Sequence, residues 1–137
     1  MGKRLYIVIC ILNSLIALLL GGVIYTLFRP DTYIYLWVHT LLPLPTFDFP
    51  ATVFVSVLKG YLVDALWAYA LTFALCVVIK PISAGVLSVA MGVVWEVCQL
   101  CDICSGTFDC LDILMYLTAS VIAVLIIKSI VKRRKMR

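Results

Sequence analysis

The fold of this chain is decided near its N-terminus, where residues 5–28 read LYIVICILNSLIALLLGGVIYTLF. Only Asn13, Ser14 and Thr26 interrupt this apolar run of 24 residues. At a rise of about 1.5 Å per residue, a helix of this length crosses the roughly 30 Å hydrocarbon core of a bilayer. Lys3 and Arg4 precede the run, as in a signal peptide. The run is long, however, and no convincing small-x-small cleavage site follows it, so we predict a retained signal-anchor.

The composition of the whole chain points the same way. Hydrophobic residues make up 65% of the 137 residues and charged residues 13%, and the mean hydropathy is +1.18. Ordinary globular chains have about 45–50% apolar and about 25% charged residues. A water-soluble fold of this size could not bury so much apolar surface, so we predict that lipid surrounds it. Four spans of about 20 residues would use more than half of the chain, which leaves no room for a large extramembrane domain.

The apolar pattern predicts three further spans. The second covers residues 61–79 and ends at Lys80-Pro81, the third covers 82–100, and the fourth covers 110–131 after a polar break at 102–109. Because the turn between the second and third spans is very short, these two helices should be antiparallel neighbours. The sequence therefore predicts an all-α fold, a polytopic membrane helix bundle with four transmembrane helices in one membrane domain of residues 1–137.

Residues 31–60 are too apolar for a free loop and too interrupted for a clean span. Aromatic residues of the kinds that settle at the membrane–water boundary come first: Tyr33, Tyr35 and Trp37. Three prolines then break the segment: Pro43, Pro45 and Pro50. Asp48 before Phe49-Pro50 predicts the start of a short helix that stops near Lys59-Gly60. We expect an interfacial or partly re-entrant segment, in which His39, the only histidine of the chain, is an interface residue rather than a base.

The basic residues fix the predicted orientation. Nine of the eleven Lys and Arg residues fall on one side of the membrane: Lys3, Arg4, Lys80, Lys128, Lys132, Arg133, Arg134, Lys135 and Arg137. Only Arg29 and Lys59 fall on the other side. Because Lys and Arg near span ends favour the cytoplasmic side, we predict that the N-terminus and the C-terminus are both cytoplasmic.

The net charge of +4 invites a nucleic-acid partner, but six basic residues crowd the C-terminus directly after an apolar run. Such a cluster is typical of a stop-transfer anchor and topology signal. It also attracts anionic lipid headgroups, at about 1 kcal/mol per charge near the membrane surface. We therefore expect the lipid bilayer and anionic headgroups as partners, and no nucleic acid.

The predicted topology places all seven carboxylates in the outer half of the protein or beyond it: Asp31, Asp48, Asp64, Glu96, Asp102, Asp109 and Asp112. Glu96 is the most informative because it lies well inside the third span. A lone carboxylate there costs several kcal/mol unless it is neutral, paired or facing a wet cavity. Gln99 lies at i+3 on the same helix face and could be its partner. We interpret Glu96 as functional, with a protonated or hydrogen-bonded packing role as the alternative.

Further polar groups lie at the same depth and side. Asp64 lies one turn inside the second span, and Asp109 and Asp112 open the fourth span one turn apart, although either of these two could instead cap that helix. We predict an outward-facing acidic pocket for a cation, a protonated amine, a proton relay or a polar headgroup. Its candidate ligand-binding residues are Asp64, Glu96, Gln99, Asp109, Asp112 and Tyr116. No catalytic residue and no cofactor are predicted.

Four of the six cysteines cluster at the predicted outer end in the order C-x2-C-x2-C-x5-C: Cys98, Cys101, Cys104 and Cys110. The pattern superficially suggests an iron–sulfur or zinc site. Its last gap differs from the common ferredoxin run, and part of it continues a transmembrane helix that would misdirect the thiols, so we predict no metal. Two alternatives stay open: a disulfide of Cys110 with Cys101 or Cys104 in an oxidising compartment, or free thiols.

Two motifs flank the loop between the third and fourth spans: Trp95-Glu96-x-x-Gln99, and Gly106-Thr107-Phe108-Asp109-x-x-Asp112-Ile113 followed by Tyr116. This part of the chain resembles the VanZ-like family of small bacterial membrane proteins, which have a Glu-x-x-Gln at a helix end, a short loop and an Asp-x-x-Asp-type start of the next span. The similarity covers about the C-terminal three-fifths of the chain. It implies a multi-pass protein of the bacterial cytoplasmic (inner) membrane with a role in the cell envelope, since the founding member is linked to glycopeptide resistance.

Our first interpretation is thus a non-enzymatic, VanZ-like envelope protein whose pocket binds a polar ligand or a lipid headgroup. The rival is a small secondary transporter or ion-conducting protein that uses Glu96 and Asp64 as proton or cation sites. Four spans are few for a monomeric transporter, so the rival predicts a homo-oligomer. A membrane hydrolase or transferase with carboxylates as acid and base is the least supported class, because no nucleophile or phosphate-binding loop accompanies them.

Overall fold

The computed structural model describes residues 3–28, 33–42, 52–104 and 106–135, and within these ranges the regular structure is entirely helical. The helices are α1 (Lys3–Phe28), α2 (Tyr33–Leu41), α3 (Val53–Val57), the π-helical turn η1 (Leu58–Leu62), α4 (Val63–Leu75), α5 (Pro81–Leu100) and α6 (Cys110–Lys135). Four helical stretches are long and apolar enough to cross a membrane: Arg4–Phe28, Val53–Leu75, Pro81–Leu100 and Cys110–Lys132. The predicted all-α bundle of a multi-pass membrane protein is therefore confirmed.

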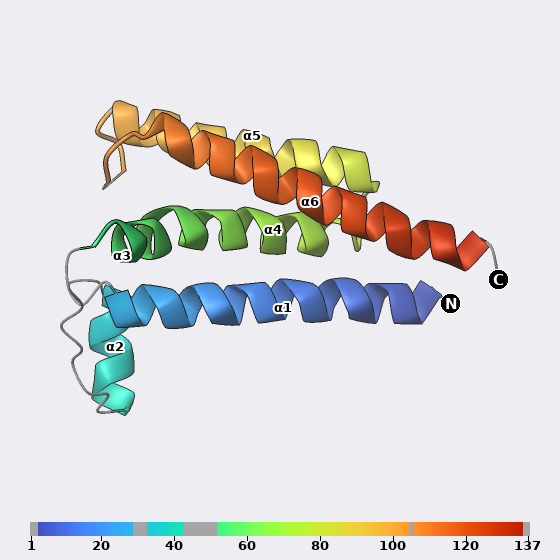
Figure 1. The fold of residues 1–137 in the computed structure, drawn as a ribbon, viewed down its shortest axis with the longest axis horizontal. Coiled ribbons are helices and arrows are strands. Elements are labelled where there is room, and N and C mark those ends of the chain that lie inside the picture. The colour runs from blue at the N-terminus through green and yellow to red at the C-terminus, as the bar shows by residue number, and fades with distance from the viewer. Residues whose placement is uncertain (1–2, 29–32, 43–51, 105, 136–137) are drawn as a thin grey trace.

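The four long helices lie side by side, with α4 at the centre of the bundle (Figure 1). Helix α1 packs on one side of α4, and α5 and α6 pack on α4 and on each other. The start of α1 and the end of α6 lie at the same end of the bundle (Figure 1). Helix α2 runs across the direction of α1 at the opposite end, and its nine residues are too few to span a bilayer. Its position at the membrane surface stays a prediction.

The second span differs from the sequence prediction at both ends. The helix starts at Val53, where the Thr52 side chain accepts a hydrogen bond from Val55 N, and it runs through Lys59-Gly60 as the π-turn η1. It does not break there because every broken backbone hydrogen bond is costly in lipid, whereas a π-turn keeps these bonds. It ends at Leu75, and after a short turn the residue before Pro81, Lys80, is extended with ψ 146°. The predicted helix start at Asp48 lies outside the described residues.

Small side chains let the helices approach each other closely. On α1 a stripe of buried residues faces α4, at spacings of four and three: Cys10, Ser14, Ala17 and Gly21. On α5 the buried stripe recurs at every fourth residue: Ala84, Ser88, Gly92 and Glu96. Lipid tails are as apolar as leucine, so membrane helices associate through such close packing rather than through the hydrophobic effect. The residues that interrupt the apolar runs are therefore the ones that hold the bundle together.

Hydroxyl groups tie the three-helix core of α4, α5 and α6 together. Ser88 Oγ on α5 donates a hydrogen bond of 2.9 Å to the carbonyl oxygen of Ala68 on α4. The Thr72 hydroxyl on α4 is hydrogen-bonded to Ser120 Oγ on α6 at 3.2 Å. All three hydroxyls are buried, and no buried side-chain nitrogen or oxygen in the described part of the chain lacks a hydrogen-bond partner. Such bonds specify how each helix is rotated about its axis.

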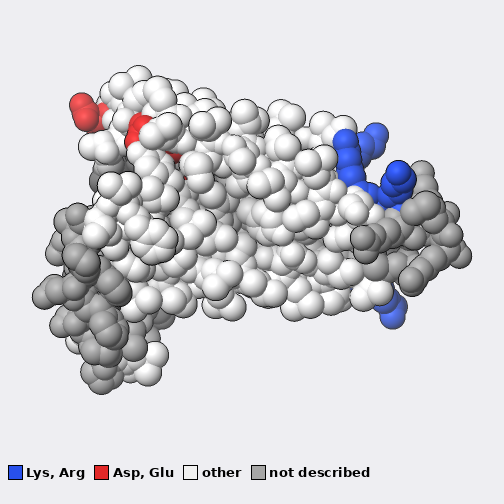
Figure 2. All heavy atoms as spheres, viewed as in Figure 1, with Lys and Arg blue, Asp and Glu red and all other residues white. Residues whose placement is uncertain are grey.

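Charged side chains are separated between the two ends of the bundle. Figure 2 shows lysine and arginine side chains at the end where α1 starts and α6 finishes, and acidic side chains at the opposite end, beside the connection between α5 and α6. We call these the basic end and the acidic end. The long wall between them carries the exposed apolar side chains of the four spans, as expected of a surface that faces lipid.

Candidate functional site at the acidic end

A cavity of about 540 Å³ opens at the acidic end between α4, α5 and α6. Side chains of several helices and of the α5–α6 loop line it: Tyr25, Asp64, Trp67, Met91, Trp95, Glu96, Gln99, Gly106, Thr107, Asp112 and Tyr116. Five of the six residues that the sequence nominated for a ligand site are among them. The structure thus brings these five together, while their role in binding stays a prediction.

Glu96 is the most deeply buried acid of the cavity, with only 1% of its surface exposed. It continues the stripe of small residues on α5, so the same helix face that packs against the neighbouring helices carries its carboxylate inward. Both carboxylate oxygens accept hydrogen bonds. The Tyr116 hydroxyl on α6 donates to Oε1 at 3.0 Å, and the backbone N–H of Asp109 donates to Oε2 at 3.2 Å. Glu96 therefore fastens α5 to the start of α6 and also lines the cavity.

The position of Tyr116 depends on a glycine. A methyl group added at Gly92 would lie 2.7 Å from Tyr116 Cγ, closer than real carbon atoms approach. The tyrosine ring therefore lies directly against the backbone of α5, one turn before Glu96, and its hydroxyl reaches that carboxylate. On its other side the ring meets Trp67 of α4 edge-on, with ring centroids 6.0 Å apart. Two aromatic rings thus form one wall of the cavity.

Gln99 joins the end of α5 to the loop that follows. When its amide is oriented by its neighbours, Oε1 accepts from Trp95 Nε1 at 3.0 Å and Nε2 donates to the Thr107 carbonyl oxygen at 3.2 Å. Gly106 makes this contact feasible, because it has φ 137° and because a side chain there would overlap the Gln99 amide. The side chain of Gln99 therefore supports the loop and does not hydrogen-bond Glu96 in this structure, unlike the partnership that their i+3 spacing suggested.

The loop itself starts with a well-defined helix end. Asp102 has φ 54° and its N–H bonds the Gln99 carbonyl oxygen at 3.1 Å, while the Ile103 N–H bonds the Cys98 carbonyl oxygen at 2.9 Å. This is the Schellman arrangement, with aspartate at the left-handed position usually taken by glycine. It turns the chain sharply after α5, so that the loop folds back over the cavity.

Asp109 has a different place from the other nominated acids. Its Oδ1 accepts from the Leu111 N–H at 2.9 Å, which makes it the N-cap of α6, and its Oδ2 accepts from the Tyr61 hydroxyl at 2.8 Å. The capping role that the sequence left open for Asp109 or Asp112 therefore falls to Asp109. Asp109 does not line the cavity, but its backbone N–H holds Glu96.

Asp64 and Asp112 complete the cavity from α4 and α6, and both are partly exposed. Each takes part in interactions with its surroundings. Together with Glu96 they place one carboxylate from each of three helices around one space. Of the three acids, Asp64 and Asp112 are the two that are partly exposed, whereas Glu96 is buried.

Several lining residues were not nominated from the sequence. Trp95, Gly106 and Thr107 belong to the two motifs around the loop, so these motifs could have been used to nominate them. Trp67, three residues after Asp64 on α4, also lines the cavity. Tyr25 lies near the outer end of the predicted first span, but the sequence does not show that α1 packs beside α4, so it gave no reason to nominate Tyr25.

The cysteines and the histidine stand apart from this cavity. All six cysteines are free thiols in the structure, with Cys101 and Cys110 exposed, and the disulfide that the sequence left open as one of two alternatives stays a hypothesis. Among the described residues, no group of three or more His, Cys, Asp or Glu side chains is placed to hold a metal ion. His39 lies on α2 and does not line the cavity.

Comparisons of this chain with protein-family models, with curated proteins and with solved structures find no match.

Proposed function

We propose that this protein is a VanZ-like component of the bacterial cell envelope whose cavity at the acidic end binds an ammonium-bearing ligand, namely the headgroup of an aminophospholipid. One observation carries the proposal. Carboxylates from three helices, Asp64, Glu96 and Asp112, surround a single cavity of about 540 Å³ that also has aromatic walls. This volume lies within the range of about 300–1,000 Å³ that small-molecule sites occupy.

The chemistry of the lining suits a primary amine. An ammonium group donates three hydrogen bonds, and carboxylate oxygens accept them. The faces of aromatic rings attract a cation by about 0.5–2 kcal/mol, and the exposed rings of Trp67 and Trp95 line the cavity. Negative charge alone would suit a metal ion equally well. The combination with aromatic faces favours an organic cation.

The three acids have separate parts in this proposal. Asp64 and Asp112 are partly exposed and contact the ammonium group. Glu96 is a positioning residue, since both of its oxygens already accept hydrogen bonds from Tyr116 and Asp109. Through the hydrogen bond from the Tyr116 hydroxyl, Glu96 fixes the wall of the cavity that Tyr116 forms.

The location follows from charge. Lysine and arginine near span ends favour the cytoplasm, so the basic end faces inward and the acidic end outward in our proposal. The cavity then opens among the headgroups of the outer leaflet of the cytoplasmic membrane. The resemblance of residues 95–116 to the VanZ-like family supports a role in the envelope.

Native mass spectrometry in nanodiscs made of phosphatidylethanolamine and phosphatidylglycerol tests the proposal. We expect the wild type to retain phosphatidylethanolamine and the Asp64→Asn and Asp112→Asn variants to lose it. Asp102→Asn is the matched control, because this substitution removes the same charge at the same end and Asp102 does not line the cavity. Equal retention by Asp64→Asn, Asp112→Asn and the wild type contradicts the proposal, as does an equal loss in Asp102→Asn.

The same spectra report the number of chains in the assembly. A monomer that holds the lipid supports a binding protein. A dimer or larger assembly with no retained lipid favours the alternative, a small transporter that uses these carboxylates for protons or cations.

A further inference from the structure

The basic end has a hollow of its own, of about 710 Å³. Three lysines from two parts of the chain line it: Lys80 in the turn before α5, and Lys128 and Lys132 one turn apart on α6. Tyr6 and Ser83 add hydroxyl groups, and none of the described residues that line the hollow is acidic. Three ammonium groups around one space repel each other unless an anion lies between them.

The start of α5 adds to this positive field. Pro81 and Ser83 of its first turn line the hollow, and no side chain caps this helix end. The amide groups of a helix N-terminus carry a partial positive charge, which favours an anion nearby. The lysines dominate the field, and the helix end reinforces it.

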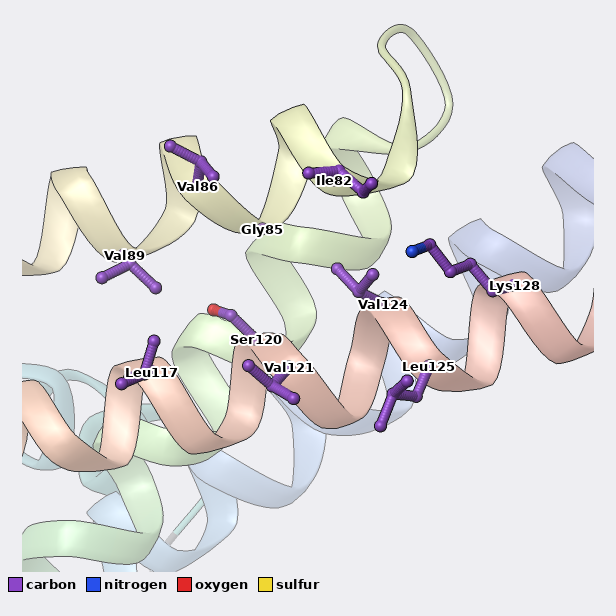
Figure 3. A pocket seen from close by; sticks show the side chains of 10 residues that line it. All are labelled: Ile82, Gly85, Val86, Val89, Leu117, Ser120, Val121, Val124, Leu125 and Lys128. Carbon is purple, nitrogen blue, oxygen red and sulfur yellow. The ribbon is translucent and has the colours of Figure 1, made fainter.

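A second, apolar hollow of about 410 Å³ continues from the first. It lies between α5 and α6 and shares Ile82 and Lys128 with the basic hollow. Figure 3 shows this groove with Lys128 at one end, its amine turned toward Ile82, and with Leu117 near the other end. Apolar side chains line the groove between these ends, among them Val86, Val89, Val121 and Leu125. The groove therefore leads from the three lysines along the lipid-facing wall of the bundle.

The length of the groove matches one leaflet. Leu117 and Lys128 are 11 residues apart on α6, which corresponds to about 16 Å along the helix axis. The hydrocarbon core of a bilayer is about 30 Å thick, so one leaflet contributes about half of that. An acyl chain that starts at the level of the lysines would run the length of the groove.

We propose that one anionic phospholipid of the leaflet at the basic end binds here, with its phosphate among Lys80, Lys128 and Lys132 and one acyl chain in the groove between α5 and α6. The charge of the hollow selects this occupant. A second copy of the chain, docked symmetrically on this face, would bring three more lysines against these three. The site does not depend on the proposed function of the acidic end, and it is a defined place rather than the diffuse attraction expected of a basic C-terminus.

Binding of phosphatidylglycerol to the purified full-length protein, measured by native mass spectrometry as lipid is titrated, tests this inference. Each lysine contributes about 1 kcal/mol to the attraction of an anionic headgroup. Lys80→Gln and Lys128→Gln should therefore each raise the dissociation constant for phosphatidylglycerol about fivefold. Arg4→Gln is the control for charge at the same end, because Arg4 is exposed and does not line either hollow. Phosphatidylcholine with the same acyl chains should bind at least tenfold more weakly than phosphatidylglycerol.

A matched pair of neighbours tests the groove. Val121 lines it and is 49% exposed, whereas Ile122 is 47% exposed and does not line it. Val121→Trp should displace the acyl chain and weaken phosphatidylglycerol binding at least tenfold, and Ile122→Trp should leave binding unchanged.

Three results would overturn the inference. Unchanged binding in Val121→Trp removes the acyl chain from the groove. Thermal stabilisation by inorganic phosphate equal to that by phosphatidylglycerol makes the lysines a site for free phosphate. A lipid-free dimer that Val121→Trp dissociates assigns the groove to a second copy of the chain.

Discussion

The hydroxyl of Tyr116 on α6 donates a hydrogen bond of 3.0 Å to Oε1 of Glu96 on α5, inside a part of the bundle that is long and apolar enough to cross a membrane. The bond exists because Gly92, one turn before Glu96, leaves room for the tyrosine ring. A buried carboxylate without partners is expensive in lipid, and this contact, together with the N–H of Asp109, satisfies it. Glu96 is therefore part of the packing of the bundle as well as of the cavity.

Gly92→Ala should destabilise the protein. The added methyl group overlaps the Tyr116 ring, and overpacking of this kind costs about 1–3 kcal/mol. Gly22→Ala on α1 is the matched control, because nothing lies within 4 Å of a methyl group there and alanine favours a helix by up to about 1 kcal/mol. We expect a lower midpoint of thermal unfolding in detergent for Gly92→Ala alone. Equal midpoints for the two variants would mean that the ring is not seated against α5.

The N-cap hydrogen bond of Asp109 should contribute more to the stability of the protein than the hydrogen bond between Asp109 and Tyr61. Asp109→Ala removes the N-cap of α6, at about 1 kcal/mol, together with the acceptor for the Tyr61 hydroxyl. Tyr61→Phe removes only that hydroxyl, and Asp109→Asn keeps a side chain that caps about as well as aspartate. Thermal unfolding should rank Asp109→Ala as the least stable of the three. A larger loss in Tyr61→Phe would show that the cap contributes little.

The hydroxyls of Thr72 and Ser120 should be energetically coupled. They are hydrogen-bonded at 3.2 Å between α4 and α6, and such bonds in membrane proteins average about 0.6 kcal/mol with a maximum of about 1.7. A double-mutant cycle of Thr72→Val and Ser120→Ala, read from unfolding free energies in mixed micelles, should give a coupling in this range. The cycle of Thr72→Val with Thr118→Val should give none, since Thr118 is exposed on α6.

Thiol labelling should reveal the orientation of the bundle. Cys101 and Cys110 are exposed at the acidic end, whereas Cys76 is buried beside the turn before α5. A membrane-impermeant maleimide applied to intact cells at pH 7 should therefore label single-cysteine variants at Cys101 and Cys110 and leave Cys76 unlabelled, because a buried thiol is out of reach of the reagent. Denaturation in detergent should make all three reactive.

Two other labelling patterns carry information. Labelling of Cys101 and Cys110 only after lysis would show that the acidic end faces the cytoplasm, opposite to the predicted topology. In the wild type, labelling of these thiols that requires a reductant would establish the disulfide that the sequence left open.

The sequence predicted the fold well wherever the evidence was local. The first, third and fourth spans lie within a few residues of their predicted bounds, because apolar length and the rise of a helix fix them. The predicted start of the second span was wrong, because a glycine beside a lysine at Lys59-Gly60 suggested that a helix ends there, and the helix continues through both residues. A helix in an apolar setting continues through such a pair, since ending it would leave backbone groups without partners.

The site was predicted in part for a similar reason. Asp64, Glu96 and Asp112 share a depth and a side that follow from topology, and the structure brings them around one cavity. Asp109 is one turn from Asp112, yet Asp109 caps the helix and only Asp112 lines the cavity. The choice between them depends on how α6 is rotated about its axis, which the pattern of this apolar helix does not encode.

The sequence by itself determined the number of apolar spans and the separation of basic from acidic residues, because these follow from hydropathy and from the order of charges along the chain. Only the tertiary structure decided that α4 is central, that Tyr116 and Asp109 satisfy Glu96, and that three lysines meet beside an apolar groove. In lipid, nearly every face of such a helix is apolar. Close contacts at small residues, as at Gly92 and Ser88, therefore set which face turns inward, and they form only when the helices pack.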